Sequence, residues 1–314
     1  MNAIKKRYSS LKEKRIPLTL FLLLISVAAS GLLSPYITIY AREGVLLCFN
    51  AIIGSVFPFL LLTDIVVSTA RFGNITIFKS LFEKIFKING YAISAFIIGA
   101  VCGFPLGVKV ASNLYKSRAI TKEECERLIG FSNNTGPAFV ISGIGAALRG
   151  SVRDGVILYI SMITGAILVG ILLGVGKTPS KTSIKDFAYP HYSFTKSVSS
   201  AAQSTMNICA YIILFSVICG ILTFPLGEGI FYSLTVSFIE VSNAAKILSG
   251  ATLLPESISI ILTSFAISFS GISVHMQAKS FLEGTDISMT VYYKAKLIQG
   301  IISAAITAVI ITII

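Results

Sequence analysis

Charged side chains are scarce in this sequence, and their scarcity excludes two classes of protein. Only 13% of the 314 residues are Asp, Glu, Lys or Arg, whereas 54% are apolar. A soluble domain of this size carries charge on roughly a quarter of its residues, so the composition excludes a soluble enzyme and a disordered chain. The apolar residues gather in runs of about 18–27 residues, the length that crosses a bilayer as a helix. We therefore expect an all-α polytopic membrane protein.

Motifs for metal binding and catalysis are also missing. The chain has two histidines and five cysteines, with neither a CxxC pair nor an HExxH motif, so we expect no metal site. It contains no Walker loop, GxSxG or other nucleophile–base pairing, and we expect no enzyme, no catalytic residue and no cofactor. The cysteines lie mostly in apolar runs and are interpreted as free packing residues: Cys48, Cys102, Cys125, Cys209 and Cys219.

Basic residues outnumber acidic ones by 26 to 14, and they lie between the apolar runs. In a membrane protein this pattern sets orientation, because Lys and Arg concentrate in cytoplasmic loops. We therefore interpret the net charge of +12 as a signature of the lipid bilayer and expect no nucleic acid as a partner.

Nine apolar segments and one long polar linker organise the chain. The segments lie at about 17–40, 45–70, 91–115, 128–148, 155–176, 198–224, 230–249, 254–280 and 291–314. The linker 177–197 is rich in Lys, Ser and Thr and separates two halves. We divide the chain into a basic N-terminus with a first membrane helix (1–44), repeat one (45–149), a linking helix with a polar cytoplasmic loop (150–199) and repeat two (200–314). The first apolar segment exceeds the 7–15 residues of a signal-peptide core, which favours a retained helix.

Residues 74–88 predict a helix of a different kind, with one apolar and one charged face. The apolar face carries Phe78, Leu81, Phe82, Ile85 and Phe86, and the charged face carries Lys79, Glu83, Lys84 and Lys87. We expect this helix to lie in the plane of the membrane interface rather than to span the membrane.

The distribution of basic residues predicts two re-entrant hairpins. If 91–115 crossed the membrane, the basic stretches 71–90 and 109–127 would lie on opposite sides, which the positive-inside rule disfavours. If 91–115 and 254–280 each enter and return, 19 of the 26 basic residues fall on the cytoplasmic side. We therefore expect a multi-pass protein of the cell membrane with a cytoplasmic N-terminus.

Helix-breaking residues lie at the middle of both proposed hairpins. The first hairpin has Gly103, Pro105 and Gly107 in GFPLG, and the second is interrupted within SFSGISVHMQ. Non-helical backbone at membrane depth survives only where protein buries it or where it lines a cavity, so both tips are candidates for substrate binding. The candidate residues of the second tip are Ser270, Gly271, Ser273, His275 and Gln277. A buried structural histidine is the alternative interpretation of His275.

The two halves resemble each other weakly at a steady offset. Gly103 and Gly271 differ by 168 positions, and RLIGF (127–131) matches KLIQG (296–300) at an offset of 169. Chance similarity between apolar helices is the alternative explanation. The charge distribution, however, starts the two copies from opposite sides of the membrane, which is the architecture of many secondary transporters. We therefore expect two inverted repeats with re-entrant helical hairpins.

The segment ITKEECERLIGFSNNTGPAFV (120–140) places polar groups inside an apolar span. A capping box at 121–124 predicts the start of a helix. Pro137 removes one backbone donor and frees the carbonyl of Asn133, because its ring clashes with the preceding turn. Together with Asn134, these groups are candidates for binding an ion or a polar solute. The alternative is a kinked helix whose amides bind a neighbouring helix.

The span 230–249 carries polar residues along one stripe of its predicted helix: Ser233, Ser237, Glu240 and Asn243. A carboxylate is costly against lipid, so Glu240 should face the interior of the bundle. Glu240 is therefore the best candidate for proton or sodium coupling, with Asn243 beside it as a binding residue. The alternatives are an ion pair with Lys246 and an interfacial helix that keeps Glu240 in water.

Several of these motifs resemble a known family. GFPLG (103–107), the segment 120–140, FSGISVHMQ (269–277) and KLIQG (296–300) are similar to the YlbJ family of sporulation integral membrane proteins, which is built on the nucleoside-recognition, or Gate, domain. The resemblance covers about 45–314. It implies a membrane protein needed for spore formation and a distant kinship to concentrative nucleoside transporters, which use two re-entrant hairpins. Kinship of fold does not make nucleosides the ligand.

We therefore expect a permease-like carrier that moves a small polar solute by alternating access. The expected partners are the lipid bilayer and a small polar solute or ion. A second copy of the chain and other sporulation membrane proteins are further candidates. The alternative function is a non-transporting membrane scaffold or partner that is needed for assembly of the spore envelope.

Overall fold

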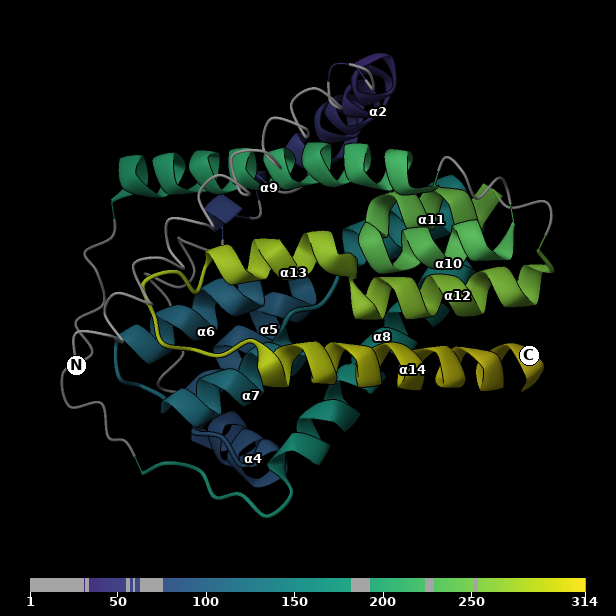
Figure 1. Ribbon diagram of the computed structural model, residues 1–314. Coiled ribbons are helices and arrows are strands. Elements are labelled where there is room, and N and C mark those ends of the chain that lie inside the picture. Colours follow the sequence, from purple (N-terminus) through teal and green to yellow (C-terminus); the bar gives the residue numbers. More distant parts are fainter. Residues whose placement is uncertain are drawn as a thin grey trace, which may run out of the picture.

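The computed structural model describes residues 31, 34–54, 57–58, 60–62, 76–181, 193–223, 229–250 and 254–313. Every regular element in these ranges is a helix, and the described residues contain no strand (Figure 1). The all-α class is therefore confirmed. All five cysteines are free, also as predicted. The expected first helix at 17–40 lies mostly outside the described residues.

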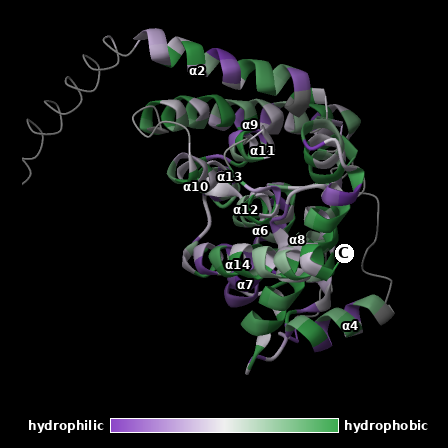
Figure 2. Cartoon of the chain, turned by 90° about the vertical axis from the view of Figure 1, so that its right-hand side faces the viewer, coloured by the Kyte–Doolittle hydropathy of each residue, from purple (hydrophilic) through white to green (hydrophobic). Residues whose placement is uncertain are grey.

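Within the described residues, four segments are long and apolar enough to cross a membrane. They are α8 (Val152–Gly174), most of α9 (Phe194–Thr223), the pair α12–α13 (Glu256–Ser280) and α14 (Thr290–Ile313). Hydropathy colouring shows these helices as mostly hydrophobic (Figure 2). They also expose large apolar side chains such as Ile301 and Val309, which are 57% and 58% exposed. Such surfaces belong against lipid rather than water, so the chain is a multi-pass membrane protein, as predicted.

The helix α2 (Ser34–Leu47) continues into the π-turn η1 (Cys48–Ile52) and packs along α9. Gly44 permits this close approach, because a Cβ there would lie 2.9 Å from the Cα of Ile213. The sequence predicted the end of one span and the start of the next at 41–44, but α2 runs through these positions without a break. The predicted boundary was wrong. Arg42 and Glu43 lie on an exposed face of α2, so their charges do not interrupt the helix.

The first predicted hairpin is present. The helices α5 (Ile93–Val101) and α6 (Leu106–Lys116) pack against each other across a turn at Gly103, whose φ is +88°. Gly99 and Gly107 lie on opposite sides of this turn and touch, since a Cβ on Gly99 would lie 3.1 Å from the Cα of Gly107. Each arm is roughly 14–17 Å long at 1.5 Å per residue, about half of the hydrocarbon core. Neither arm can span the bilayer alone.

The second hairpin is not where the sequence predicted it. The helices α10 (Ile230–Ile239) and α11 (Val241–Gly250) fold back on each other at Glu240, whose backbone is extended with φ −146° and ψ 120° (Figure 1). The prediction of one continuous span over 230–249 was therefore wrong. A single extended residue is enough to reverse the chain here, although the position has neither Gly nor Pro.

The segment 254–280 does not turn back, contrary to the prediction. It forms α12 (Glu256–Phe269) and α13 (Gly271–Ser280), which together make one interrupted helix of 25 residues (Figure 1). Ser270 and Gly271 are both left-handed, with φ values of 76° and 72°. These two residues unwind the helix while leaving its direction unchanged.

The two hairpins enter from opposite ends of the bundle, and their tips meet near its middle (Figure 1). After the first hairpin come an interrupted helix, α7 (Lys122–Ser132) with η4 (Ala138–Leu148), and the long helix α8. After the second come the interrupted α12–α13 and the long α14. In this order the tip at Gly103 corresponds to the tip at Glu240. The sequence offsets had instead paired Gly103 with Gly271. The inverted relation of the two halves stays a prediction.

The predicted amphipathic helix is α4 (Thr76–Phe86), which meets the following segment Gly90–Val101 at 102°. Part of its apolar face is buried in an aromatic cluster that consists of Phe82, Phe86, Phe96 and Phe131. Phe78 and Leu81 on the same helix stay more than half exposed. The helix is thus anchored on one edge, and its exposed apolar edge suits the membrane interface.

Glu124 ties three segments together at one end of the bundle. It forms the predicted capping box with Thr121 at the start of α7. Its carboxylate also accepts hydrogen bonds from the backbone N–H groups of Asn89 (2.8 Å) and Ser180 (2.9 Å) and from the Ser180 hydroxyl (2.7 Å). Burial alone would raise the pKa of Glu124, but these hydrogen bonds favour the charged form and lower the pKa below its usual value.

We expect Glu124→Gln to destabilise the protein by roughly 1.5–3 kcal/mol at neutral pH, the worth of hydrogen bonds to a charged group. Because the folded-state pKa is lowered, the stabilisation is complete above the unfolded-state pKa of about 4.3 and is lost as the pH falls through the folded-state value. Melting temperatures of wild type and variant should therefore converge in acid. Glu283→Gln, on an exposed loop, is the control. A destabilisation by Glu124→Gln that stayed constant with pH would contradict this role.

Candidate functional site

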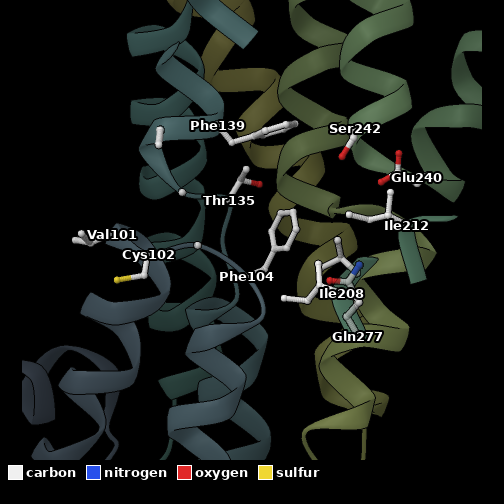
Figure 3. A pocket seen from close by; sticks show the side chains of 14 residues that line it. Val101, Cys102, Phe104, Thr135, Phe139, Ile208, Ile212, Glu240, Ser242 and Gln277 are labelled. Carbon is white, nitrogen blue, oxygen red and sulfur yellow. The ribbon is translucent and has the colours of Figure 1, made fainter. Parts of the chain in front are cut away.

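A cavity of about 70 Å³ lies where the two hairpin tips meet (Figure 3). The first tip and the break between α7 and η4 form one wall, with Phe104 and Thr135 among the lining residues. The second tip and α13 form the opposite wall, with Glu240 and Gln277, and α9 contributes Ile208. Since roughly 10–15 Å³ of such space holds one water, the cavity has room for an ion or a few waters.

The first tip is pressed against the break of the neighbouring helix. A Cβ on Gly103 would lie 2.8 Å from the backbone nitrogen of Gly136, and Cβ atoms on Gly99 or Gly107 would both overlap the carbonyl oxygen of Ser132. Pro105 lies just before α6 at its N-cap position. The glycines of the GFPLG motif therefore serve close backbone packing, and of this motif Gly103 and Phe104 reach the cavity.

The polar residues at the break of α7–η4 are buried and hydrogen-bonded. The Asn133 amide donates to the Tyr292 hydroxyl at 2.8 Å, and the Asn134 amide donates to the carbonyl of Phe131 at 2.8 Å. Thr135 donates to the carbonyl of Ile267 at 2.9 Å. The alternative prediction, in which the amides bind a neighbouring helix, thus holds for Asn133. Of these three side chains, that of Thr135 alone lines the cavity.

Glu240 is 1% exposed and forms the tip of the second hairpin. One carboxylate oxygen accepts the backbone N–H of Asn243 at 2.7 Å, which caps α11. Asn243 itself points away from the cavity, and its amide donates to Ser216 of α9 at 3.2 Å. The predicted stripe does not form, because the helix breaks at Glu240. No ion pair joins Glu240 to Lys246 in the described part of the chain, and Lys246 is exposed.

The second tip is in turn pressed against the break of α12–α13. A Cβ on Gly271 would lie 3.0 Å from the carbonyl oxygen of Ile239, the residue before the tip. Ser270 bonds back to the carbonyl of Ile267 at 3.2 Å and does not reach the cavity. Each interrupted helix therefore presents its unwound residues to one hairpin tip.

His275 and Gln277 have different environments on α13. His275 bonds through Nε2 to the carbonyl of Phe269 at 2.8 Å and lies between the rings of Phe269 and Tyr292. This contact supports its structural interpretation. Gln277 lines the cavity, and its amide donates to Ser273 at 3.3 Å. Within the described residues its buried Oε1 atom has no hydrogen-bond partner.

The structure also places a functional group that sequence reasoning did not assign. A stripe of completely buried polar side chains runs along α14 and consists of Tyr292, Lys296, Gln299, Ser303 and Thr307. The first three contact the break of α7–η4, whereas Thr307 donates to the Ser264 hydroxyl of α12 at 2.8 Å. Gln299 donates to the side-chain oxygen of Asn134 at 2.8 Å. The spacing of 4, 3, 4 and 4 along an apolar span is the signal that the sequence offers for this stripe.

Comparison with known proteins supports the resemblance of the motifs. The chain is 23% identical over 309 residues to the sporulation integral membrane protein YlbJ of Bacillus subtilis (strain 168), and the match covers 84% of this chain and 75% of that protein. No family model matches the chain, and no solved structure matches it. The predicted similarity thus holds over most of the chain, which is a multi-pass membrane protein and a relative of the sporulation protein YlbJ.

Proposed function

We propose that this chain is a carrier that moves a small polar solute across the cell membrane by alternating access, and that its transport serves spore formation. The observation that carries this proposal is the meeting of two half-length hairpins, from opposite ends of the bundle, at one cavity. Half-helices that end at membrane depth expose backbone polar groups, which persist only where they are buried or line a cavity. Broken helices around a midplane site are typical of secondary transporters.

The two tips supply a physical basis for alternating access. Each tip closes the cavity from its own end, because the arms of each hairpin extend toward one end of the bundle. Displacing the tip at Gly103 would open the cavity toward the end from which α5 and α6 enter. Displacing the tip at Glu240 would open it toward the other end.

The lining residues indicate which solutes suit the cavity. Its polar side chains are one carboxylate, that of Glu240, and three neutral groups, those of Thr135, Ser242 and Gln277. No Lys or Arg is among the lining residues in the described part of the chain. A cation or a neutral solute with N–H or O–H donors is therefore favoured over an anion.

A panel of solutes tests the proposal directly. A ligand that binds the folded state raises the melting temperature, so we expect the purified protein to be stabilised by at least one solute among nucleosides, amino acids, metal ions and dipicolinate. The stabilising solute should then be taken up by proteoliposomes that contain the protein and not by empty liposomes. No stabilisation and no flux across the panel would contradict the carrier and favour a non-transporting membrane partner.

A further inference from the structure

Lys296 is completely buried in the middle of the bundle without a counterion. Its side chain is 0% exposed, and among the described residues no carboxylate lies within ion-pair distance of it. The ammonium donates instead to two neutral oxygens, the carbonyl of Asn133 at 2.7 Å and the Oε1 of Gln299 at 2.8 Å. A charge in this position is costly, so the residue is better explained by a function than by a gain in stability from an ion pair.

The carbonyl of Asn133 is the acceptor that Pro137 leaves without a helical partner. Proline has no N–H to donate, and its ring displaces the carbonyl four residues earlier. Lys296 satisfies this carbonyl from α14, which is 163 positions further along the chain. Tyr292 and Gln299 of the same helix hold the side chains of Asn133 and Asn134. A single face of α14 therefore holds the unwound residues of α7–η4 through one cation and two neutral groups.

Freed carbonyls of unwound helices coordinate Na⁺ in membrane carriers. A monovalent cation bound at this break would use the same type of ligands, a backbone carbonyl and a side-chain amide oxygen. We propose that the Lys296 ammonium is a built-in cation, which occupies a monovalent-cation site at the break and holds the unwound helix without bound Na⁺ or K⁺. The consequence for transport rests on the proposed function, but the cation site itself is a property of the fold.

Removing the Lys296 ammonium should leave a site that a free alkylammonium ion is able to occupy. Lys296→Ala leaves the two oxygens without their donor, and we expect its melting temperature to fall by about 3 °C or more, a readily measured shift for a chain of this size. n-Propylammonium chloride should restore at least half of this loss, whereas n-propanol, which has the same chain length but no charge, should not. Lys294→Ala is the matched control, because Lys294 is exposed two residues earlier on α14. It should show neither effect.

Lys296→Met tests the charge with the side-chain length retained. We expect it to be destabilised like Lys296→Ala and to gain nothing from propylammonium, since the methionine side chain fills the space. Glu240→Gln, which lacks the single carboxylate among the described residues that line the cavity, should melt at the same temperature in NaCl, KCl and choline chloride of equal ionic strength. If either variant does not fold in plain buffer, it is purified in propylammonium chloride, and Lys296→Ala should then fold.

Four results would overturn the proposal. They are a Lys296→Met variant as stable as the wild type, equal restoration of Lys296→Ala by propanol, no restoration by propylammonium under any purification, and a Glu240→Gln variant stabilised specifically by Na⁺ or K⁺. All of these measurements record melting temperature and none uses solute flux. A failed carrier therefore cannot be mistaken for a failed cation site, nor the reverse.

Discussion

Gradient-driven uptake should fall by about ten-fold or more when Glu240 is replaced with Gln, the factor that a loss of roughly 1.4 kcal/mol produces, while the protein stays folded. Glu240 is the single carboxylate among the described residues that line the cavity. Glutamine keeps its shape and is still able to accept the N–H of Asn243, now 2.7 Å from the carboxylate, so the cap of α11 is preserved. It removes the negative charge that a coupling cation, a proton or a basic solute would need.

The measurement is uptake into proteoliposomes of the solute that stabilises the protein most, with the melting temperature recorded on the same preparations. Glu256→Gln is the control, because this carboxylate at the start of α12 has a side chain that is 89% exposed. Uptake should be unchanged in the control. Unchanged uptake in Glu240→Gln would remove Glu240 from the coupling role. Loss of the fold instead would assign Glu240 to capping of α11.

Gly99→Ala should destabilise the protein by about 3 kcal/mol, the upper end of what overpacking a core costs. A methyl group at this position would overlap the carbonyl oxygen of Ser132 and would lie 3.1 Å from the Cα of Gly107. Both neighbours are backbone atoms held by their own helices, so neither can rotate away. The first hairpin would have to separate from α7, and we expect uptake to fall together with the melting temperature.

Gly143→Ala is the matched control for this prediction. Gly143 also lies in an apolar helix, η4, but a Cβ there would meet its nearest neighbour, a ring carbon of Phe139, at an ordinary 3.7 Å. Alanine favours helix over glycine by up to about 1 kcal/mol, so this variant should be as stable as the wild type or more stable. Equal melting temperatures for Gly99→Ala and Gly143→Ala would show that the hairpin yields without cost.

The sequence was sufficient for features that depend on local composition. The spans α8, α9 and α14 follow from the length of their apolar runs, and α4 follows from the periodicity of its two faces. The first hairpin follows from GFPLG together with the basic residues on both sides of it. The capping box of α7 and the freed carbonyl of Asn133 follow from fixed spacings of four residues or fewer. In each case the cause and the effect lie within one or two turns of the same helix.

The candidate site could be predicted only in part. Gly103, Glu240 and Gln277 line the cavity, whereas Asn133, Asn134, Asn243 and His275 are engaged in contacts with another helix. A polar side chain in an apolar span must find a partner, and the sequence does not show whether that partner is a solute or another helix. The spacing of residues gives the face of a helix, while the neighbouring helix decides what the face meets.

By itself, the sequence determined that the chain lies in a membrane, how long its spans are and where its helices break, because hydropathy and helix-breaking residues act locally. Only the tertiary structure decided which break reverses the chain. The glycine-containing break at Gly271 continues straight, whereas the break at Glu240 turns back against α11. The structure alone also decided that Lys296, 163 positions away in the sequence, donates a hydrogen bond to the carbonyl of Asn133. Both outcomes depend on how helices distant in the sequence pack against one another, which no local pattern of residues records.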